Sequence, residues 1–106
     1  MHKMVVLAKA APGKTEALAK WYDEQHMNDL LAVPGLVTAE RHDLLLLKHP
    51  EGTPRWDFML IYELAGPDPM EVVKNMAMAQ VSISDLLEST STLSVIGLSQ
   101  GLRREA

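Results

Sequence analysis

A histidine occupies a position that a helix should bury. Four residues spaced four apart would form one stripe of an α-helix: Leu18, Tyr22, His26 and Leu30. Leucine and tyrosine are ordinary core residues, whereas an unperturbed histidine titrates at a pKa of about 6.5. At cellular pH an imidazole can accept a proton and return it within one reaction cycle. His26 is therefore the first candidate catalytic residue.

Two acidic residues lie within one helical turn of His26. Asp23 precedes it by three residues and Asp29 follows it by three, so either carboxylate can hold the imidazole or raise its basicity. A carboxylate near a helix C-terminus is electrostatically unfavourable, which favours a specific partner for Asp29. The simpler alternatives are a histidine at the rim of the core, bonded to a backbone carbonyl, and an exposed Asp29 in the last turn.

Two aromatic residues precede these acids. Tyr22 shares the stripe of His26, and its hydroxyl is a candidate donor to a carbonyl or phenol oxygen of a ligand. The simpler role for Tyr22 is in the core, with its hydroxyl bonded to a nearby group. Trp21 lies off the stripe, so packing or a dimer contact is its simpler role and substrate contact its functional one.

An arginine and a second histidine are adjacent at Arg41-His42, within a predicted strand. Successive side chains of a strand point to opposite faces, so only one of the two can face the helices. On that face, His42 would pair with His26, whereas Arg41 would bind an anionic group of a substrate. Both are candidate substrate-binding residues.

Alternate residues of a later segment form an aromatic-rich stripe: Trp56, Phe58, Leu60 and Tyr62. A stripe of this kind usually packs in the core. If it faces the helices, it would also suit a flat aromatic ligand. Its three aromatic members are therefore candidate substrate-binding residues.

The composition excludes several classes of function. The 106 residues include 47% hydrophobic residues and no cysteine, and the formal net charge is −4. The lack of cysteine excludes disulfides, thiolate metal sites and a cysteine nucleophile. Nucleic-acid binding needs a concentrated basic face, but the lysines and arginines here are scattered. A membrane span needs roughly 20 apolar residues in succession, and no stretch of the sequence approaches that length. We therefore expect a cytoplasmic protein without nucleic-acid or membrane partners. No His-x-x-x-His or Glu-x-x-His pair has convincing metal-ligand spacing, and phosphate loops and dinucleotide fingerprints are absent, so we expect neither a metal site nor a cofactor.

The first part of the chain predicts a strand and a helix. The β-branched run "KMVVLAK", residues 3–9, is typical of a strand. Residues 15–31 have helical periodicity, with Thr15 as a candidate cap. Pro34-Gly35 should end this helix, because the residue before a proline is pushed out of the α region.

The middle of the chain predicts a hairpin. Residues 36–49 are interpreted as a second strand, in which the leucines 44–47 would be buried on both faces. The segment "PEGTP", residues 50–54, is typical of a turn. Residues 55–64 alternate clearly and predict the third strand.

The last part predicts a helix and a strand. Asp68 is a natural N-cap, Pro69 fits the first helical position, and Glu71 stands where a capping box needs it. Residues 82–88 are expected to continue this helix after a bend or to form a short second piece. Residues 91–99 predict the last strand.

The resulting order β-α-β-β-α-β predicts one ferredoxin-like domain over residues 1–106. In this α+β sandwich both helices cover one face of an antiparallel sheet. Strands two and three carry apolar residues on both faces, and a large apolar patch is rarely left in water. We therefore expect a homodimer that pairs through the open face of the sheet.

The stretch "WYDEQHMNDLLAVPGLVTAERH", residues 21–42, resembles the dimeric α/β-barrel superfamily, in particular its EthD-like members. Those proteins commonly carry Trp-Tyr-Asp-x-x-His-x-x-Asp followed by Leu-Ala-Val-Pro-Gly and a strand, and the match is continuous over residues 21–35. The resemblance implies a ferredoxin-like subunit that pairs through its sheet into a dimeric α/β barrel, with a small pocket between sheet and helices. The superfamily includes muconolactone isomerases, polyketide cyclases, cofactor-free monooxygenases and haem enzymes, so kinship alone does not choose a reaction.

Three hypotheses follow. The first is a small cofactor-independent isomerase, cyclase or lyase that acts on an apolar aromatic or polyketide-like compound. In it His26 moves a proton, Tyr22 stabilises the oxyanion and an acidic neighbour orients the imidazole. The second is a non-catalytic ligand-binding or accessory dimer. The third is a cofactor-free oxygenase or a haem protein of the same superfamily.

Overall fold

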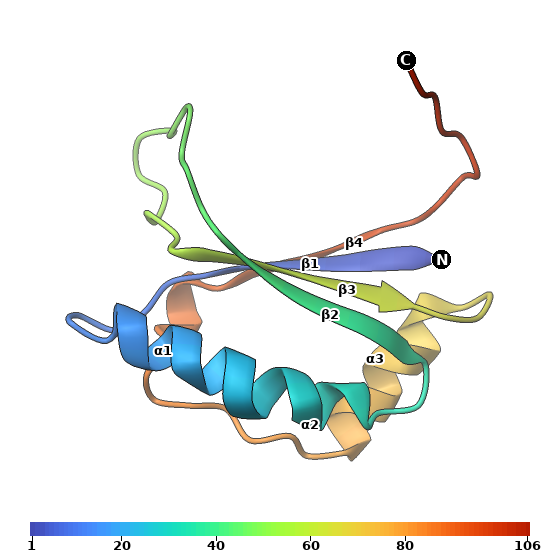
Figure 1. Ribbon diagram of the computed structural model, residues 1–106, viewed down its shortest axis with the longest axis horizontal. Helices are drawn as coiled ribbons and strands as arrows, with labels where there is room; N and C mark the ends of the chain where they lie inside the picture. Colours follow the sequence, from blue (N-terminus) through green and yellow to red (C-terminus); the bar gives the residue numbers. More distant parts are fainter.

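Four strands form one antiparallel sheet with helices on one of its faces (Figure 1). The computed structural model describes all residues from Met1 to Ala106. The strands are β1 (His2–Ala8), β2 (Leu36–Asp43), β3 (Phe58–Leu64) and β4 (Leu93–Gly97), in the spatial order β2-β3-β1-β4. This order is that of the ferredoxin-like fold, which confirms the predicted fold class.

The first helix contains an interruption that periodicity does not predict. It runs continuously through α1 (Thr15–Trp21), the π-helical turn η1 (Tyr22–His26) and α2 (Met27–Leu31), so its predicted bounds are correct. In η1 the Met27 N–H donates to the carbonyl of Tyr22, five residues earlier. The prediction that Thr15 caps the helix is wrong, because Lys14 holds the N-cap position and no side chain caps this end.

The second helix, α3 (Pro69–Met78), begins as expected. The Asp68 side chain caps it by accepting a hydrogen bond of 3.0 Å from the Met70 N–H, and Pro69 occupies the first helical position. The capping box expected at Glu71 is not formed, because its side chain makes no hydrogen bond and only its backbone N–H donates to the Asp68 carbonyl, at 3.2 Å. None of the helices combines the length and the apolar character that crossing a bilayer requires.

The prediction of helix over residues 82–88 is wrong. This segment is irregular and pairs with the strand end, since Leu87 forms an isolated bridge with Ala10. The Ser84 hydroxyl accepts a hydrogen bond of 3.1 Å from the Leu86 N–H. Such local side-chain bonding offers the backbone an alternative to a helix. Only a single 3₁₀ turn, η2 (Ser89–Ser91), precedes β4.

The second strand is shorter than predicted. β2 ends at Asp43, and the leucines 44–47 lie in the loop between β2 and β3. Leu45 is 83% exposed and Leu47 is 94% exposed, so the expectation that this run is buried on both faces is wrong. The physical reason is the lack of a continuing partner: β3 begins only at Phe58, and after the hydrogen bond of 3.0 Å from the Leu44 N–H to the Asp57 carbonyl the ladder does not extend along the leucines.

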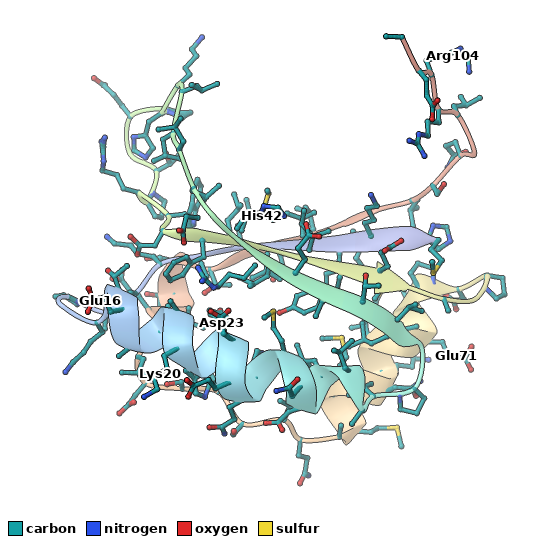
Figure 2. The ribbon with its side chains drawn as sticks, viewed as in Figure 1. Glu16, Lys20, Asp23, His42, Glu71 and Arg104 are labelled. Carbon is teal, nitrogen blue, oxygen red and sulfur yellow. The ribbon has the colours of Figure 1, made fainter.

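A β-bulge changes which β2 residues face the helices. The pairing with β3 shifts between Leu36 and Thr38. Regular alternation would place Leu36 on the same face as Thr38 and His42, but the bulge turns it toward the helices, where it is buried. Beyond the bulge Arg41 faces the helices, and His42 faces away from them (Figure 2).

The predicted stripe of the third strand forms the centre of the core. Phe58, Leu60 and Tyr62 are all buried beneath the helices, next to Leu18 and Tyr22 of the first helix. The opposite face of the sheet is apolar as well. Its register places six apolar side chains together on three adjacent strands: Val5, Leu7, Met59, Ile61, Leu93 and Val95.

We predict that Gly35→Ala costs more stability than Gly13→Ala, although both glycines have a positive φ. A Cβ at Gly35 would lie 2.6 Å from Val72 Cγ2, whereas a Cβ at Gly13 meets nothing within 4 Å. The left-handed conformation costs an alanine about 1–2 kcal/mol at either site. The clash with Val72 adds about 1–3 kcal/mol at Gly35. Urea unfolding of the two variants measures the difference, and equal losses would contradict the close packing of Gly35 on α3.

Candidate active site

A small cavity lies between the first helix and the segment that leads into β4. Its volume is about 230 Å³. The lining residues come from both elements: Trp21, Tyr22, His26, Ile83, Leu87, Ser89 and Thr92. The structure thus brings three of the predicted site residues together at one cavity. We call it the His26 pocket.

The π turn explains why Trp21 belongs to this pocket. In an α-helix, residues five apart point about 140° away from each other, which is why Trp21 was expected off the stripe of His26. The wider η1 turn brings them onto one side, and the Trp21 and His26 rings stack with their centroids 4.3 Å apart and their planes at 19°. Single π turns within helices are frequently found at functional sites.

His26 has an unusual electrostatic environment. Its Nδ1 atom is buried and makes no hydrogen bond. Burial lowers the pKa of His26 below its ordinary value, and the charge of Asp29 opposes this shift. The ring is therefore neutral at pH 7.

Tyr22 forms the inner wall of the pocket. It is only 3% exposed, its ring meets His26 edge-on at 5.5 Å, and it packs edge-on against Phe58 at 6.4 Å. Burial raises the pKa of Tyr22 to about 12, so its hydroxyl remains a proton donor. Burial and the neighbouring Tyr22 raise the pKa of Tyr62 too. Phe58 and Tyr62 thus lie among the buried residues beneath the site and are absent from the lining of the pocket.

Asp23 does not orient the imidazole, contrary to one of our two expectations. Its carboxylate accepts two hydrogen bonds from Arg41, of 2.8 Å from Nε and 3.0 Å from Nη2. Figure 2 places Asp23 between the helix and the sheet. The Arg41 guanidinium also donates to Asp43 at 2.7 Å and lies 4.9 Å from the centre of the Phe58 ring. Arg41 is thus fully engaged with protein groups and joins β2 to the π turn.

His42 lies on the other face of the sheet from His26. Its ring is hydrogen-bonded to Glu40, two residues earlier on the same strand. The expected His-His pair is therefore not formed. Successive side chains of a strand point to opposite faces, and Arg41 is the one that faces the helices. A contact between His42 and a ligand of the His26 pocket is ruled out by this placement.

Trp56 holds the far wall of the pocket in place. It precedes β3, and its indole N–H donates a hydrogen bond of 2.7 Å to the carbonyl of Ser91. Ser91 lies between Ser89 and Thr92, the two polar residues of the pocket lining. Sequence reasoning missed this whole wall, because residues 82–88 were expected to be helical. The serines and threonines around position 90 were a signal for irregular backbone.

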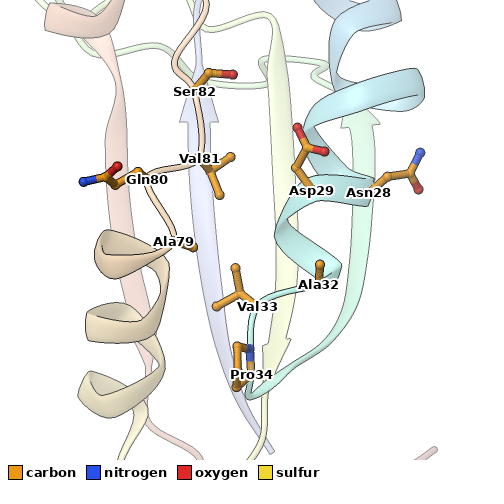
Figure 3. A pocket seen from close by; sticks show the side chains of 9 residues that line it. All are labelled: Asn28, Asp29, Ala32, Val33, Pro34, Ala79, Gln80, Val81 and Ser82. Atoms are coloured by element: carbon orange, nitrogen blue, oxygen red, sulfur yellow. The ribbon is translucent and has the colours of Figure 1, made fainter.

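Asp29 lies beside a second, larger cavity. This cavity has a volume of about 520 Å³ and is bounded by the end of α2, the Pro34 turn and residues 79–82 (Figure 3). Asp29 is thus the acidic neighbour whose charge acts on His26, and Asp23 is not. No three side chains of histidine, aspartate or glutamate gather closely enough to hold a metal ion.

No family model matches the chain, and no curated protein matches it in sequence. Solved structures match it in fold. An EthD-family protein from Bacillus halodurans C-125 has a TM-score of 0.59 at 13% identity, over 94% of this chain and 100% of that one. A dimeric ferredoxin-like protein of unknown function from Thermobifida fusca YX has a TM-score of 0.52 at 17% identity, over 91% and 88%.

A third match is a protein from Shewanella loihica PV-4 that is named provisionally as a monooxygenase. Its TM-score is 0.56 at 14% identity, over 97% of this chain and 95% of that one. At these identities the matches establish the fold, and they confirm at that level the resemblance to EthD-like proteins. They do not select a reaction, because one fold hosts many activities.

We predict that Asp29→Asn lowers the titration midpoint of His26 and that Asp23→Asn leaves it nearly unchanged. The charge of Asp29 stabilises the imidazolium, whereas the charge of Asp23 is paired with Arg41. The two variants remove the same charge at equal distances along the chain from His26. NMR titration of the His26 ring in both variants measures the effect. An equal shift in both would contradict the separation of the two carboxylates.

Proposed function

We propose that the His26 pocket carries out proton transfer on a small aromatic compound. The observation that carries this proposal is an imidazole with a buried, unpartnered Nδ1, stacked on Trp21 in a cavity that it shares with the Tyr22 side chain. A histidine that served only packing would be expected to satisfy both ring nitrogens or to give way to leucine.

In this proposal His26 acts as base and then as acid. The neutral ring carries its one proton on Nδ1 and takes a second proton through Nε2, from a carbon next to a carbonyl or a phenol, since Nδ1 is enclosed by protein. The imidazolium is disfavoured by burial, so it returns the proton readily to another atom of the substrate. The sum of the two steps is an isomerisation, or one half of a cyclisation or lyase reaction.

Tyr22 is suited to stabilise the charge that develops on the substrate oxygen. Its pKa of about 12 keeps the hydroxyl protonated, and it lies on the same pocket as His26. A donor that is already fixed by packing needs little reorganisation when the oxyanion forms. The contact with Phe58 and the burial of the ring fix the phenol in this way.

The size of the pocket restricts the substrate. Ligand cavities commonly have about 300–1,000 Å³, and the His26 pocket has about 230 Å³. We therefore propose that it accepts a compound with a single aromatic ring. A larger, polyketide-like compound would place only its reacting ring there.

Two other functions use the same pocket. A non-catalytic binding module would hold the aromatic compound and transfer no proton. A cofactor-free oxygenase is favoured only by the fold likeness to the Shewanella loihica protein that is named provisionally as a monooxygenase. The two chains share 14% sequence identity, which is too little to transfer a reaction from one to the other. The proton-transfer proposal ranks first because it accounts for the state of His26.

We propose in addition that the protein works as a homodimer through the open face of its sheet. Leu93 and Val95 are 44% and 49% exposed, and they extend an apolar surface with Val5, Leu7 and Ile61. A continuous apolar patch of this kind is typical of an interface. The fold likeness to the dimeric protein from Thermobifida fusca agrees with this assembly.

The proton-transfer proposal predicts that the protein speeds the exchange of acetophenone α-protons for deuterium in D₂O, measured by NMR. His26→Gln should reduce the acceleration by about 10²–10⁴-fold, since one general base contributes this much. Tyr22→Phe should reduce it by about 10²-fold through loss of the oxyanion donor. The exposed neighbour in Gln25→Ala is the matched control and should retain the activity.

The pH dependence follows from the sign of the His26 shift. Because the active ring is neutral and its pKa lies below the ordinary value, exchange should rise with pH, with a midpoint below about 6.5, and be level at pH 7. Binding of acetophenone without any exchange in the wild type would favour the binding module instead. Equal exchange by His26→Gln would overturn the assignment of the base.

We predict that Ile61→Lys converts the dimer to a monomer, because it places a charge within the apolar sheet face, directly opposite Val5. Met78→Lys, on the exposed side of α3, is the control and should leave the dimer intact. Light scattering after size-exclusion chromatography measures the mass of each variant. A monomeric wild type would refute the proposed assembly.

A further inference from the structure

The largest cavity of the molecule is separate from the His26 pocket. It lies between the C-terminal end of α2 and the C-terminal end of α3, and it has a volume of about 520 Å³ (Figure 3). No residue lines both cavities. We call it the Asp29 cavity, after the only charged residue of its lining.

The wall of the Asp29 cavity is electronegative. Two helices end at it, with Ala32 and Ala79 as their C-caps. The C-terminus of a helix carries a partial negative charge, and neither helix has a basic residue in its last turn to offset it. The Asp29 carboxylate adds a full negative charge at the same place. No lysine or arginine lines the cavity.

The rest of the wall is mainly apolar. In Figure 3, Val33 and Val81 project toward the gap from opposite sides, and Pro34 closes one end. Toward the other end, Asp29 projects from the helix and Ser82 from the facing segment, on opposite sides of the gap, and a carboxylate and a hydroxyl can both accept hydrogen bonds. The Asn28 and Gln80 side chains point away from the gap, at its rim.

We infer that the Asp29 cavity binds a small organic cation, an ammonium group on a compact aliphatic body. The ammonium would donate to the carboxylate of Asp29 and the hydroxyl of Ser82, while the aliphatic body packs between Val33 and Val81. An anion would meet one carboxylate and two negative helix ends, and a neutral molecule would gain only the apolar contact. This inference does not depend on the proposed function of the His26 pocket.

Asp29 connects the two cavities electrostatically. Its charge acts on His26 and opposes the effect of burial there. A cation bound to Asp29 would offset that charge, so the titration midpoint of His26 should fall when the cation binds. Amine binding would thereby keep His26 neutral at lower pH. This response reports specifically on occupancy at Asp29.

The test is an NMR titration with three compounds of the same shape: cyclohexylamine, cyclohexanol and cyclohexanecarboxylate. The amine should bind at least about tenfold more tightly than the alcohol, since a hydrogen bond to a charged group is stronger than a neutral one. The carboxylate should not bind. The methyl signals of Val33 and Val81 should move, and the Trp21 indole signal should not.

Two variants test the role of the charge. Asp29→Asn keeps the shape of the cavity and should abolish the preference for the amine over the alcohol. Glu24→Gln removes an exposed charge from the same helix outside the cavity and should leave the preference intact. A third variant, Ala32→Leu, fills part of the cavity and should weaken the binding of both compounds.

Equal affinities of amine and alcohol in the wild type would overturn the inference. So would an unchanged preference in Asp29→Asn, or amine-induced shifts confined to the His26 pocket. An amine that binds without lowering the His26 midpoint would likewise exclude Asp29 as its partner. The proposed proton transfer is measured separately by exchange in the absence of amine, so either proposal can fail without the other.

Discussion

The π turn at Tyr22–His26 constrains the rest of the site. It inserts an extra residue into the helical turn, and this places Trp21 on the same side as His26, where the two rings stack. The turn is held against the sheet by two hydrogen bonds between Asp23 and Arg41 of β2. Since Arg41 also packs over Phe58 and Phe58 packs against Tyr22, one arginine supports both the backbone of the turn and the wall of the pocket.

The segment from α3 to β4 gives the site its second wall. An isolated bridge from Leu87 to Ala10 and the hydrogen bond from Trp56 to Ser91 hold this segment along the first helix. It lines the pocket together with His26, and burial is the main cause of the lowered pKa of that ring. Farther along, the same segment borders the Asp29 cavity, so one irregular stretch of chain forms a wall of both cavities.

Local patterns predicted the parts of the fold that depend on periodicity. The stripe of Tyr22 and His26, the alternation from Phe58 to Tyr62 and the cap at Asp68 depend on side-chain spacing, and all are present. The π turn has no signal in the local spacing, and its Asp23 binds Arg41 of a strand that is distant in the sequence. The sequence likewise did not distinguish Asp23 from Asp29 as the acidic partner of His26. In the structure Asp23 binds Arg41, whereas Asp29 lines the second cavity.

The central claim is that His26 is an enclosed, neutral imidazole stacked on Trp21. The most direct test is ¹⁵N and ¹H NMR of a sample labelled in histidine, which follows the ring nitrogens of His26 across its titration and records contacts with the Trp21 indole. The account predicts through-space contacts between the two rings and a midpoint below about 6.5. A midpoint at the ordinary value without any contact to the indole would contradict it.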